Sequence, residues 1–212
     1  MQNALIQADH FMNRTKMIYF SVIVALLAVA WIGWKLTSRN AYASASYSVL
    51  ESENQFEIRE YPDLYMAITP SEFDSQGKDG SFMRLFRYID GDNAQQQKVA
   101  MTTPVFMNSQ QNDAPGNMGF VIPQNLTGGE IPAPANTKVQ IHERTGGRFA
   151  VIRFSGRMNE TTVQKAEQSL RTWAARKQLQ LGDQAESAGY DPPWTPGPFR
   201  RNEVHIRLNQ SL

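Results

Sequence analysis

Hydrophobic and polar positions divide the chain into one long apolar run and a later region of short alternating runs. The apolar run, MIYFSVIVALLAVAWIGW from Met17 to Trp34, contains no charged residue. At about 1.5 Å per helical residue, its length nearly matches a hydrocarbon core of roughly 30 Å. The pattern therefore predicts residues 1–40 as a tail with one transmembrane helix at about 17–34, and residues 41–212 as a folded domain.

The residues at the two ends of this run bear on its orientation. Arg14 and Lys16 precede the run, and Lys35 and Arg39 follow it, so the preference for a cytoplasmic N-terminus is slight. We expect a single-pass membrane protein whose C-terminal domain is extracytoplasmic. A cleaved signal peptide is the alternative, because AYASA at residues 41–45 offers small residues for cleavage.

From about Tyr47 the pattern changes to short alternating runs separated by turn residues, which predicts a sheet-rich domain. FEIREY and LYMAIT are joined at Pro62-Asp63, and KVQIHE and RFAVIRF are joined at Thr145-Gly146-Gly147. We interpret each pair as a hairpin. In the second hairpin, glycines would supply the positive φ of a tight turn.

The two predicted hairpins suggest an internal duplication. Aligning Ile58 with Ile141, an offset of 83 residues, brings them into register, although chance similarity of two amphipathic hairpins is the alternative. Helical patterns follow, at Ser81 to Asp90 and at Asn159 to Gln180. Two strand-like segments then follow each helix: MTTPVFM and MGFVIP, and later the stretch from Gly189 and EVHIRL. We predict an α+β fold of two ββαββ halves, with helices on one side of an antiparallel sheet.

The two helices differ in what their faces offer. In the second helix the expected core stripe is Val163, Ala166, Leu170, Trp173 and Ala174. In the first helix the expected buried stripe is Phe82, Leu85, Phe86 and Ile89. Met83 and Arg87 share one flank of the first helix. That flank changes from apolar to cationic within one turn, which suits a flat apolar ligand carrying carboxylates.

Composition and single residues exclude several function classes. The absence of cysteine excludes disulfides and thiolate metal sites, and 21 basic against 20 acidic residues argues against nucleic-acid binding. His10 precedes the apolar run, and His142 and His205 alternate with apolar residues, so we expect all three to be exposed. Phosphate-loop, serine-hydrolase and His-Glu-x-x-His motifs are missing. We therefore assign no catalytic residue and no metal site.

Four segments together resemble the SOUL haem-binding protein family, in the family's order. They are VAMTTPVFM from Val99, MGFVIP from Met118, RFAVIRFSG from Arg148 and GYDPPWTPGPFRRNEVHIRL from Gly189. The resemblance spans roughly Tyr47 to Leu208. It implies a twisted, partly closed antiparallel β-barrel of two similar halves with two helices. It also implies binding of haem or another tetrapyrrole, without an enzymatic step in most members.

The resemblance further implies a shallow ligand groove beside the first helix and the loop before the last strand. Carried onto this sequence, the groove residues are Phe82, Met83, Phe86, Arg87, Tyr190 and Trp194. Arg87 would pair with a propionate, and Arg84, Arg200 and Arg201 are weaker candidates for that role. An alternative for Trp194 is that it plugs the end of the barrel.

Iron ligation is not implied by the residues themselves. The first hairpin and the first helix contain no histidine, and Met83 is either a weak thioether ligand or a packing residue. The sequence therefore predicts a membrane-anchored protein that binds haem or another tetrapyrrole reversibly, for sequestration or transfer. Its expected partners are porphyrin and the membrane. The alternatives are an interaction or sensing module for another hydrophobic ligand or protein partner, and an enzyme acting on a tetrapyrrole.

Overall fold

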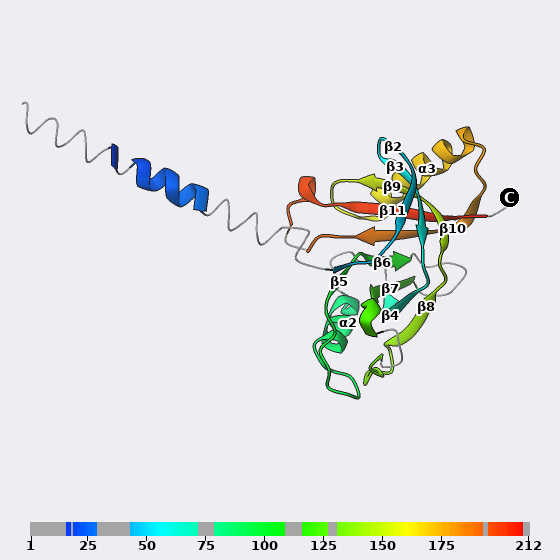
Figure 1. Cartoon of the computed structure of the whole chain (residues 1–212), viewed down its shortest axis with the longest axis horizontal. Coiled ribbons are helices and arrows are strands. Elements are labelled where there is room, and N and C mark those ends of the chain that lie inside the picture. The colour runs from blue at the N-terminus through cyan, green and yellow to red at the C-terminus, as the bar shows by residue number, and fades with distance from the viewer. Residues whose placement is uncertain are drawn as a thin grey trace, which may run out of the picture. The chain divides into compact units, whose positions relative to one another are not determined.

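The fold is that of a computed structural model, which describes residues 16–17, 19–28, 43–71, 79–108, 116–126, 131–192 and 195–209 (Figure 1). The chain divides into two compact units, Met1–Ala41 and Tyr42–Leu212. In the first unit, residues 16–17 and 19–28 are helical and expose large apolar side chains. Residues 18 and 29–34 of the predicted membrane-spanning run lie outside the described residues. None of the helices in the described ranges is both long enough and apolar enough to cross a bilayer.

The second unit is built on a nine-stranded antiparallel sheet. Its strands are β2 (Ser48–Glu53), β3 (Phe56–Tyr61), β4 (Leu64–Ser71), β6 (Val105–Asn108), β7 (Gly116–Val121), β8 (Gln140–Arg144), β9 (Gly147–Phe154), β10 (Leu181–Gly189) and β11 (Asn202–Leu208). They lie in the order β2-β3-β9-β11-β10-β6-β7-β4-β8. The short strands β1 (Ala43–Ser44) and β5 (Thr102–Thr103) form a separate parallel pair. The helices are α2 (Ser81–Ile89) and α3 (Glu160–Arg176), and η2 (Gln124–Leu126) and η3 (Gly197–Phe199) are single 3₁₀ turns.

The two predicted hairpins are wrong, although the strands themselves are where the alternation placed them. β3 pairs with β9 and β4 pairs with β8, in one continuous register from Phe56↔Ile152 to Ile68↔Gln140. Residues 56–68 and residues 140–152 therefore form one long two-stranded ribbon, which bends between β3 and β4. Alternation fixes which side chains share a face, but it does not choose the partner strand.

The bend in the ribbon explains why position 146 is a glycine, which the sequence analysis had assigned to a tight hairpin turn. The Gly146 N–H donates a 2.7 Å hydrogen bond to Asp63 Oδ1. A Cβ atom at Gly146 would lie 2.5 Å from the Tyr61 carbonyl oxygen and 2.5 Å from the Pro62 carbonyl carbon. Close approach of two backbones, rather than a hairpin, therefore requires glycine at position 146.

The strand order agrees with the predicted duplication. One half-sheet is β3-β9-β11-β10 and the other is β8-β4-β7-β6, so the order is the same when it is followed from either end of the ribbon. The third strand of the C-terminal half, in chain order, differs from the prediction. It is β10, LGDQAESAG, and the Gly189 stretch is mainly a connection. Small and polar residues fill β10, so its alternation of apolar positions is too weak to identify it.

The resemblance implied a partly closed barrel, and the structure shows a large antiparallel sheet. Its two half-sheets are joined through the β3/β4–β8/β9 ribbon and through the β10–β6 pairing, whereas the outer strands β2 and β8 do not pair with each other. The architecture is thus an α+β fold on a large antiparallel sheet. Each helix is supplied by one of the two halves.

Helix α3 follows its predicted pattern closely. Its buried residues are Val163, Ala166, Leu170, Trp173 and Ala174, as expected. Asn159 caps the helix, because its side chain accepts the Thr162 N–H while the Thr162 hydroxyl accepts the Asn159 N–H. The helix ends at Arg176, four residues before the predicted Gln180.

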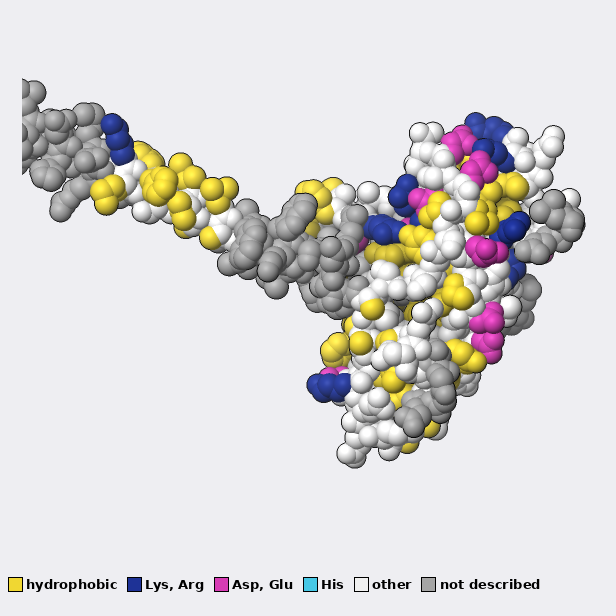
Figure 2. Space-filling view, viewed as in Figure 1, with side chains coloured by type: hydrophobic (Ala, Val, Ile, Leu, Met, Phe, Trp, Pro, Cys, Tyr) yellow, Lys and Arg dark blue, Asp and Glu magenta, His cyan; other side chains and the backbone are white. Residues whose placement is uncertain are grey.

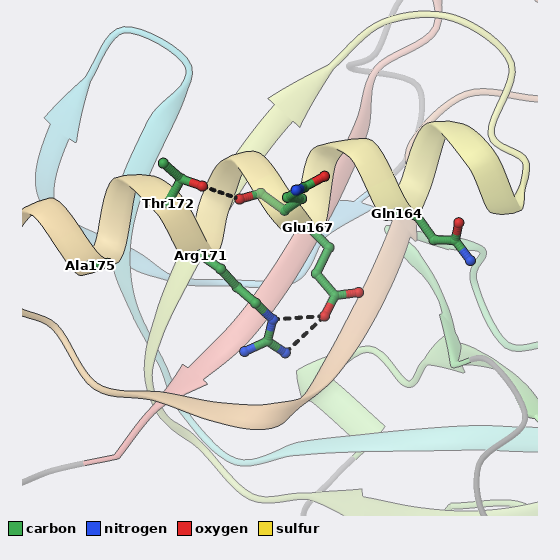
Figure 3. Close-up of a pocket in the computed structure, with 6 residues that line it drawn as sticks. Gln164, Glu167, Arg171, Thr172 and Ala175 are labelled. Atoms are coloured by element: carbon green, nitrogen blue, oxygen red, sulfur yellow. Dashed lines mark hydrogen bonds and ion pairs between the residues drawn. The ribbon is translucent and has the colours of Figure 1, made fainter.

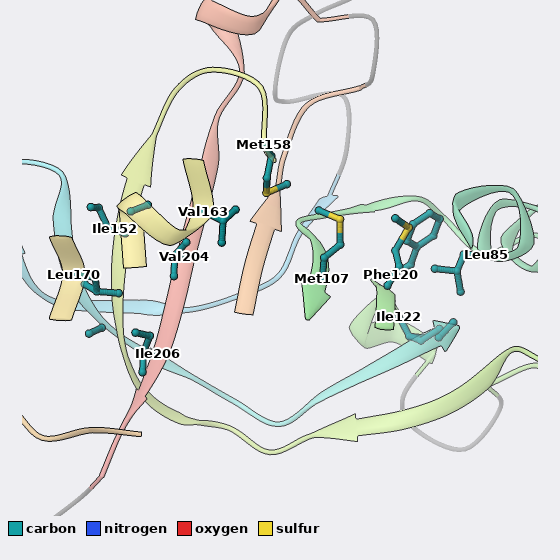
Figure 4. Close-up of a cluster of buried hydrophobic side chains, with 14 of the residues drawn as sticks. Leu85, Met107, Phe120, Ile122, Ile152, Met158, Val163, Leu170, Val204 and Ile206 are labelled. Carbon is teal, nitrogen blue, oxygen red and sulfur yellow. The ribbon is translucent and has the colours of Figure 1, made fainter. Parts of the chain in front are cut away.

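Side chains of both helices pack on one face of the sheet and form the larger core. Figure 4 shows Leu170 and Val163 of α3 beside Val204, Ile206 and Ile152, and Leu85 of α2 beside Phe120 and Ile122. Met107 and Met158 lie between these two groups (Figure 4). These two flexible side chains therefore fill the space between the core residues of one half and those of the other.

Candidate functional site

Helix α2 faces the sheet with a different stripe from the predicted one. Leu85 and Ile89 are buried as expected, and so are Ser81 and Tyr88. Phe86 is 40% exposed, and Phe82 is only partly buried. The Tyr88 hydroxyl donates a 2.9 Å hydrogen bond to the Pro132 carbonyl. A tyrosine with such a partner is readily buried, and sequence periodicity alone does not reveal that partner.

This orientation leaves three apolar side chains on the outer side of α2: Phe82, Met83 and Phe86, which we call the α2 patch. Met83 is 47% exposed. The Phe82 and Phe86 rings stack with centroids 6.3 Å apart and an interplanar angle of 15°. Phe82 also packs edge-on against Phe120 of β7, with centroids 5.3 Å apart. The patch therefore rests on the core at Phe82, and hydrophobic side chains reach the surface around α2 in Figure 2.

The two arginines of α2, Arg84 and Arg87, differ in whether their guanidinium groups are available to a ligand carboxylate. Arg84 Nε donates to Thr69 Oγ1 at 3.0 Å, and Arg84 Nη2 donates to the Pro70 carbonyl at 2.6 Å. Arg87 is exposed, and its guanidinium makes no hydrogen bond or ion pair with another described residue. Arg87 is therefore the cation of α2 that a carboxylate can reach. Arg84 stays a weaker candidate, because its guanidinium already donates to Thr69 and Pro70.

The predicted site does not come together as a whole. Phe82, Met83, Phe86 and Arg87 share the outer side of α2, but Tyr190 is only 8% exposed and packs in a second core. Trp194 lies outside the described residues. The resemblance implied that Tyr190 lines the ligand groove. The Tyr190 hydroxyl instead donates a 2.8 Å hydrogen bond to Glu203 Oε2.

The second core lies on the face of the sheet opposite the helices and contains Tyr61, Phe106 and Phe149. Charged side chains are buried with these rings. Glu203 accepts from Arg59 Nη1 at 2.8 Å and from Arg59 Nη2 at 3.0 Å. Arg201 Nη2 donates to the same carboxylate at 2.7 Å. Arg59, Glu203, Arg201, Tyr190 and His205 constitute what we call the charged cluster.

Histidine 205 was expected on the polar surface and is instead fully buried in the charged cluster. Its Nε2 atom lies 2.9 Å from Glu203 Oε2. Alternation correctly placed it opposite Val204 and Ile206, but that face is enclosed rather than solvated. His142, in contrast, is exposed on β8, as predicted.

The protonation states of the cluster follow from burial and charge. Burial alone would raise the pKa of the Glu203 carboxyl, but the His205 and Arg59 hydrogen bonds outweigh it and hold the pKa well below 4.5. Because an ionised carboxylate only accepts, His205 donates through Nε2. Burial lowers the pKa of His205 below 6.5, and burial raises the pKa of Tyr61 to about 12. The cluster thus holds ionised arginines and Glu203 together with a neutral histidine.

Arginine side chains also cover the aromatic rings of the second core. The Arg59 guanidinium carbon lies 4.2 Å from the Tyr47 ring centroid, and that of Arg144 lies 4.1 Å from the Phe149 centroid. Arg201 lies 4.0 Å from the Tyr190 centroid. These cation–π contacts fill the ring faces that a flat ligand would need. The faces of these rings are therefore covered by the chain's own arginines, and the α2 patch remains the candidate ligand site.

Two surface hollows of about 490 Å³ each lie away from α2. The first is lined by Gln164, Glu167, Gln168, Arg171, Thr172 and Ala175 of α3. Figure 3 shows Arg171 and Glu167 paired there, with Nη2 and Oε1 2.8 Å apart. The second lies beside Tyr47 and Tyr61. Both hollows are open to solvent, and the first is lined mostly by polar residues, so neither encloses a large apolar macrocycle.

Metal coordination by the described part of the chain is also limited. No three His, Asp or Glu side chains gather there as a metal site. His142 pairs across the strands with Met66, which belongs to the second core, so it lies on the sheet face opposite α2. Met83 is the one exposed sulfur on α2.

The model of the SOUL heme-binding protein family matches residues 42–207 of this chain. Heme-binding protein 1 from Xenopus laevis is 29% identical over 161 residues, which are 73% of this chain and 84% of that protein. Heme-binding protein 1 from Mus musculus is 32% identical over 129 residues, which are 58% of this chain and 67% of that protein.

Solved structures with a similar fold have little sequence identity to this chain. The EcmrR chain in a cryo-EM complex with DNA has a TM-score of 0.56 at 10% identity, covering 74% of this chain and 58% of its own length. An uncharacterized conserved protein from Listeria innocua has a TM-score of 0.55 at 9% identity, covering 74% of this chain and 93% of its own. At such identities the likeness concerns the fold alone.

Proposed function

The chain belongs to the SOUL heme-binding protein family, and from this premise we propose that it binds haem or another tetrapyrrole reversibly on the α2 patch. The proposal rests on the patch itself, in which partly exposed phenyl rings and a thioether lie beside Arg87, a guanidinium with no partner among the described residues. A macrocycle would cover Phe86 and Met83, and a propionate would pair with Arg87. Because the patch is a surface rather than a pocket, exchange for sequestration or transfer fits it better than permanent retention.

The residues around α2 fit a porphyrin better than they fit its iron. Apolar side chains and Arg87 suit the ring and its carboxylates, whereas no described histidine lies on this side of the sheet. Met83 could reach iron only as a weak thioether ligand. We therefore propose that burial of the ring and pairing of the propionate supply the binding free energy. The protein would then hold the macrocycle whether or not it carries iron.

Replacing Arg87 by alanine should weaken haem binding about tenfold, because one charge-assisted hydrogen-bonded pair at an exposed site is lost. Arg176 is the matched control, since it is also an exposed arginine in the last turn of a helix. Absorbance titration with ferric haem measures both variants. Equal affinity in Arg87→Ala and Arg176→Ala would remove Arg87 from the site.

We also propose, from the apolar run at Met17 to Trp34, that the protein is anchored in a membrane with its C-terminal domain extracytoplasmic. The full chain should sediment with membranes and resist a carbonate wash, whereas a chain starting at residue 41 should be released. Recovery of the full chain in the wash would contradict the anchor. That outcome would leave the α2 site unaffected.

A further inference from the structure

The α2 patch offers a macrocycle only one apolar surface. Its two most exposed members, Met83 and Phe86, are 47% and 40% exposed, and Phe82 lies behind them against Phe120. A porphyrin lying on this patch has its opposite face in water. That face is as apolar as the bound one, so leaving it exposed forfeits about half of the burial that drives binding.

The charges lead to the same conclusion. A haem or protoporphyrin molecule carries two propionates, whereas α2 supplies one guanidinium, that of Arg87, without a partner in the described part of the chain, because Arg84 is held by Thr69 and Pro70. One copy of the protein therefore matches one face and one carboxylate of the ligand. The remaining face and carboxylate match a second copy of the same patch.

We propose that two copies of this chain close on one macrocycle, each covering one face with its α2 patch and each pairing Arg87 with one propionate. The proposal rests on the function proposed above and specifies its partner, a second copy. The resulting complex has two chains and one ligand. Both copies use the same surface, as in a two-fold symmetric association.

The ligand is needed for this association. The patch consists of three side chains and is far smaller than the roughly 1,000 Å² that a stable protein–protein interface requires. Without a ligand, the two Arg87 guanidinium groups would also bring like charges together. The macrocycle supplies apolar area to both copies, and its propionates neutralise both guanidinium groups.

The first test is the stoichiometry of the full chain in detergent, titrated with metal-free protoporphyrin IX. The expected result is saturation at one ligand for every two chains. Excess ligand should then convert the complex into one ligand per chain, because each patch can take its own macrocycle. Saturation at one ligand per chain from the start would overturn the two-chain complex but leave the proposed function standing. Absence of saturable binding would overturn both.

The second test locates the contact. The chain has no cysteine, so a single spin label can be placed at one introduced cysteine. Asp90→Cys puts the label just after α2 at an exposed side chain, and Gln168→Cys puts it on the exposed side of α3. We expect protoporphyrin to induce dipolar coupling between copies at position 90 and much weaker coupling at position 168. Equal coupling at both positions, or none at position 90 when ligand is bound, would refute the arrangement.

Discussion

Replacing Glu203 by glutamine should lower the free energy of unfolding by about 3–5 kcal/mol, the range for breaking a buried ion pair. Glu203 is fully buried and accepts hydrogen bonds from Arg59, Arg201 and Tyr190. Glutamine keeps the shape but carries no charge, so it leaves Arg201 without its ion-pair partner and Arg59 with Glu57 alone, at 2.6 Å. Urea denaturation monitored by tryptophan fluorescence measures the change.

Glu60→Gln is the matched control for this replacement. Glu60 also lies in the sheet, but its side chain is 51% exposed and its contact with Arg148 is 3.7 Å long. We expect no measurable change there, because exposed pairs contribute little. An equally small effect of Glu203→Gln would show that the charged cluster does not stabilise the fold.

The pH dependence of the free energy of unfolding should also distinguish the Glu203→Gln variant from the unmodified protein. The folded-state pKa of Glu203 lies below its ordinary 4.5, so its contribution is present above pH 4.5 and is lost as the pH falls below that value. The Glu203→Gln variant lacks this group. Its stability should therefore fall less steeply than that of the unmodified protein below pH 4.5.

Replacing Phe86 by aspartate should weaken haem binding by about 100-fold, or roughly 2.7 kcal/mol. The change removes a ring that the macrocycle would cover and places a carboxylate where the propionates approach. Phe86 is 40% exposed, so the folded protein should tolerate the replacement. Titration with ferric haem, followed by absorbance and tryptophan quenching, gives the two affinities.

Phe199→Asp is the control that separates the two parts of the predicted groove. Phe199 is 71% exposed in η3, within the Gly189 to Ile206 stretch that the resemblance also placed beside the ligand. We expect its replacement to leave haem affinity unchanged. A large loss in Phe199→Asp together with normal binding by Phe86→Asp would move the ligand from α2 to that loop.

The sequence predicted local features better than long-range ones. Alternation located β3, β4, β8 and β9, and the 3.6-residue period located α3, because these patterns depend on which side chains share a face. Pairing depends on residues far apart in the chain. For this reason two hairpins were predicted where the structure has one ribbon. Strand β10 was missed because its apolar alternation is weak.

The candidate site shows the same division. The apolar and cationic residues of α2 were predicted, but Tyr190 belongs to the charged cluster and His205 is buried. The signal for this cluster was the row Glu203, His205 and Arg207 on one face of β11, which reads as a solvated face when burial is unknown. Arg59, on a separate strand, supplies the counter-charge that permits burial, and no local pattern connects the two.

If the α2 patch binds the macrocycle itself, ferric haem and metal-free protoporphyrin IX should bind with similar affinity. Titration of the unmodified chain with each ligand gives two dissociation constants. We expect values that agree within about threefold, a difference of roughly 0.7 kcal/mol, because ring burial and Arg87 act on both ligands alike. Binding of haem more than about tenfold tighter, with a low-spin spectrum, would show instead that iron ligation supplies the affinity.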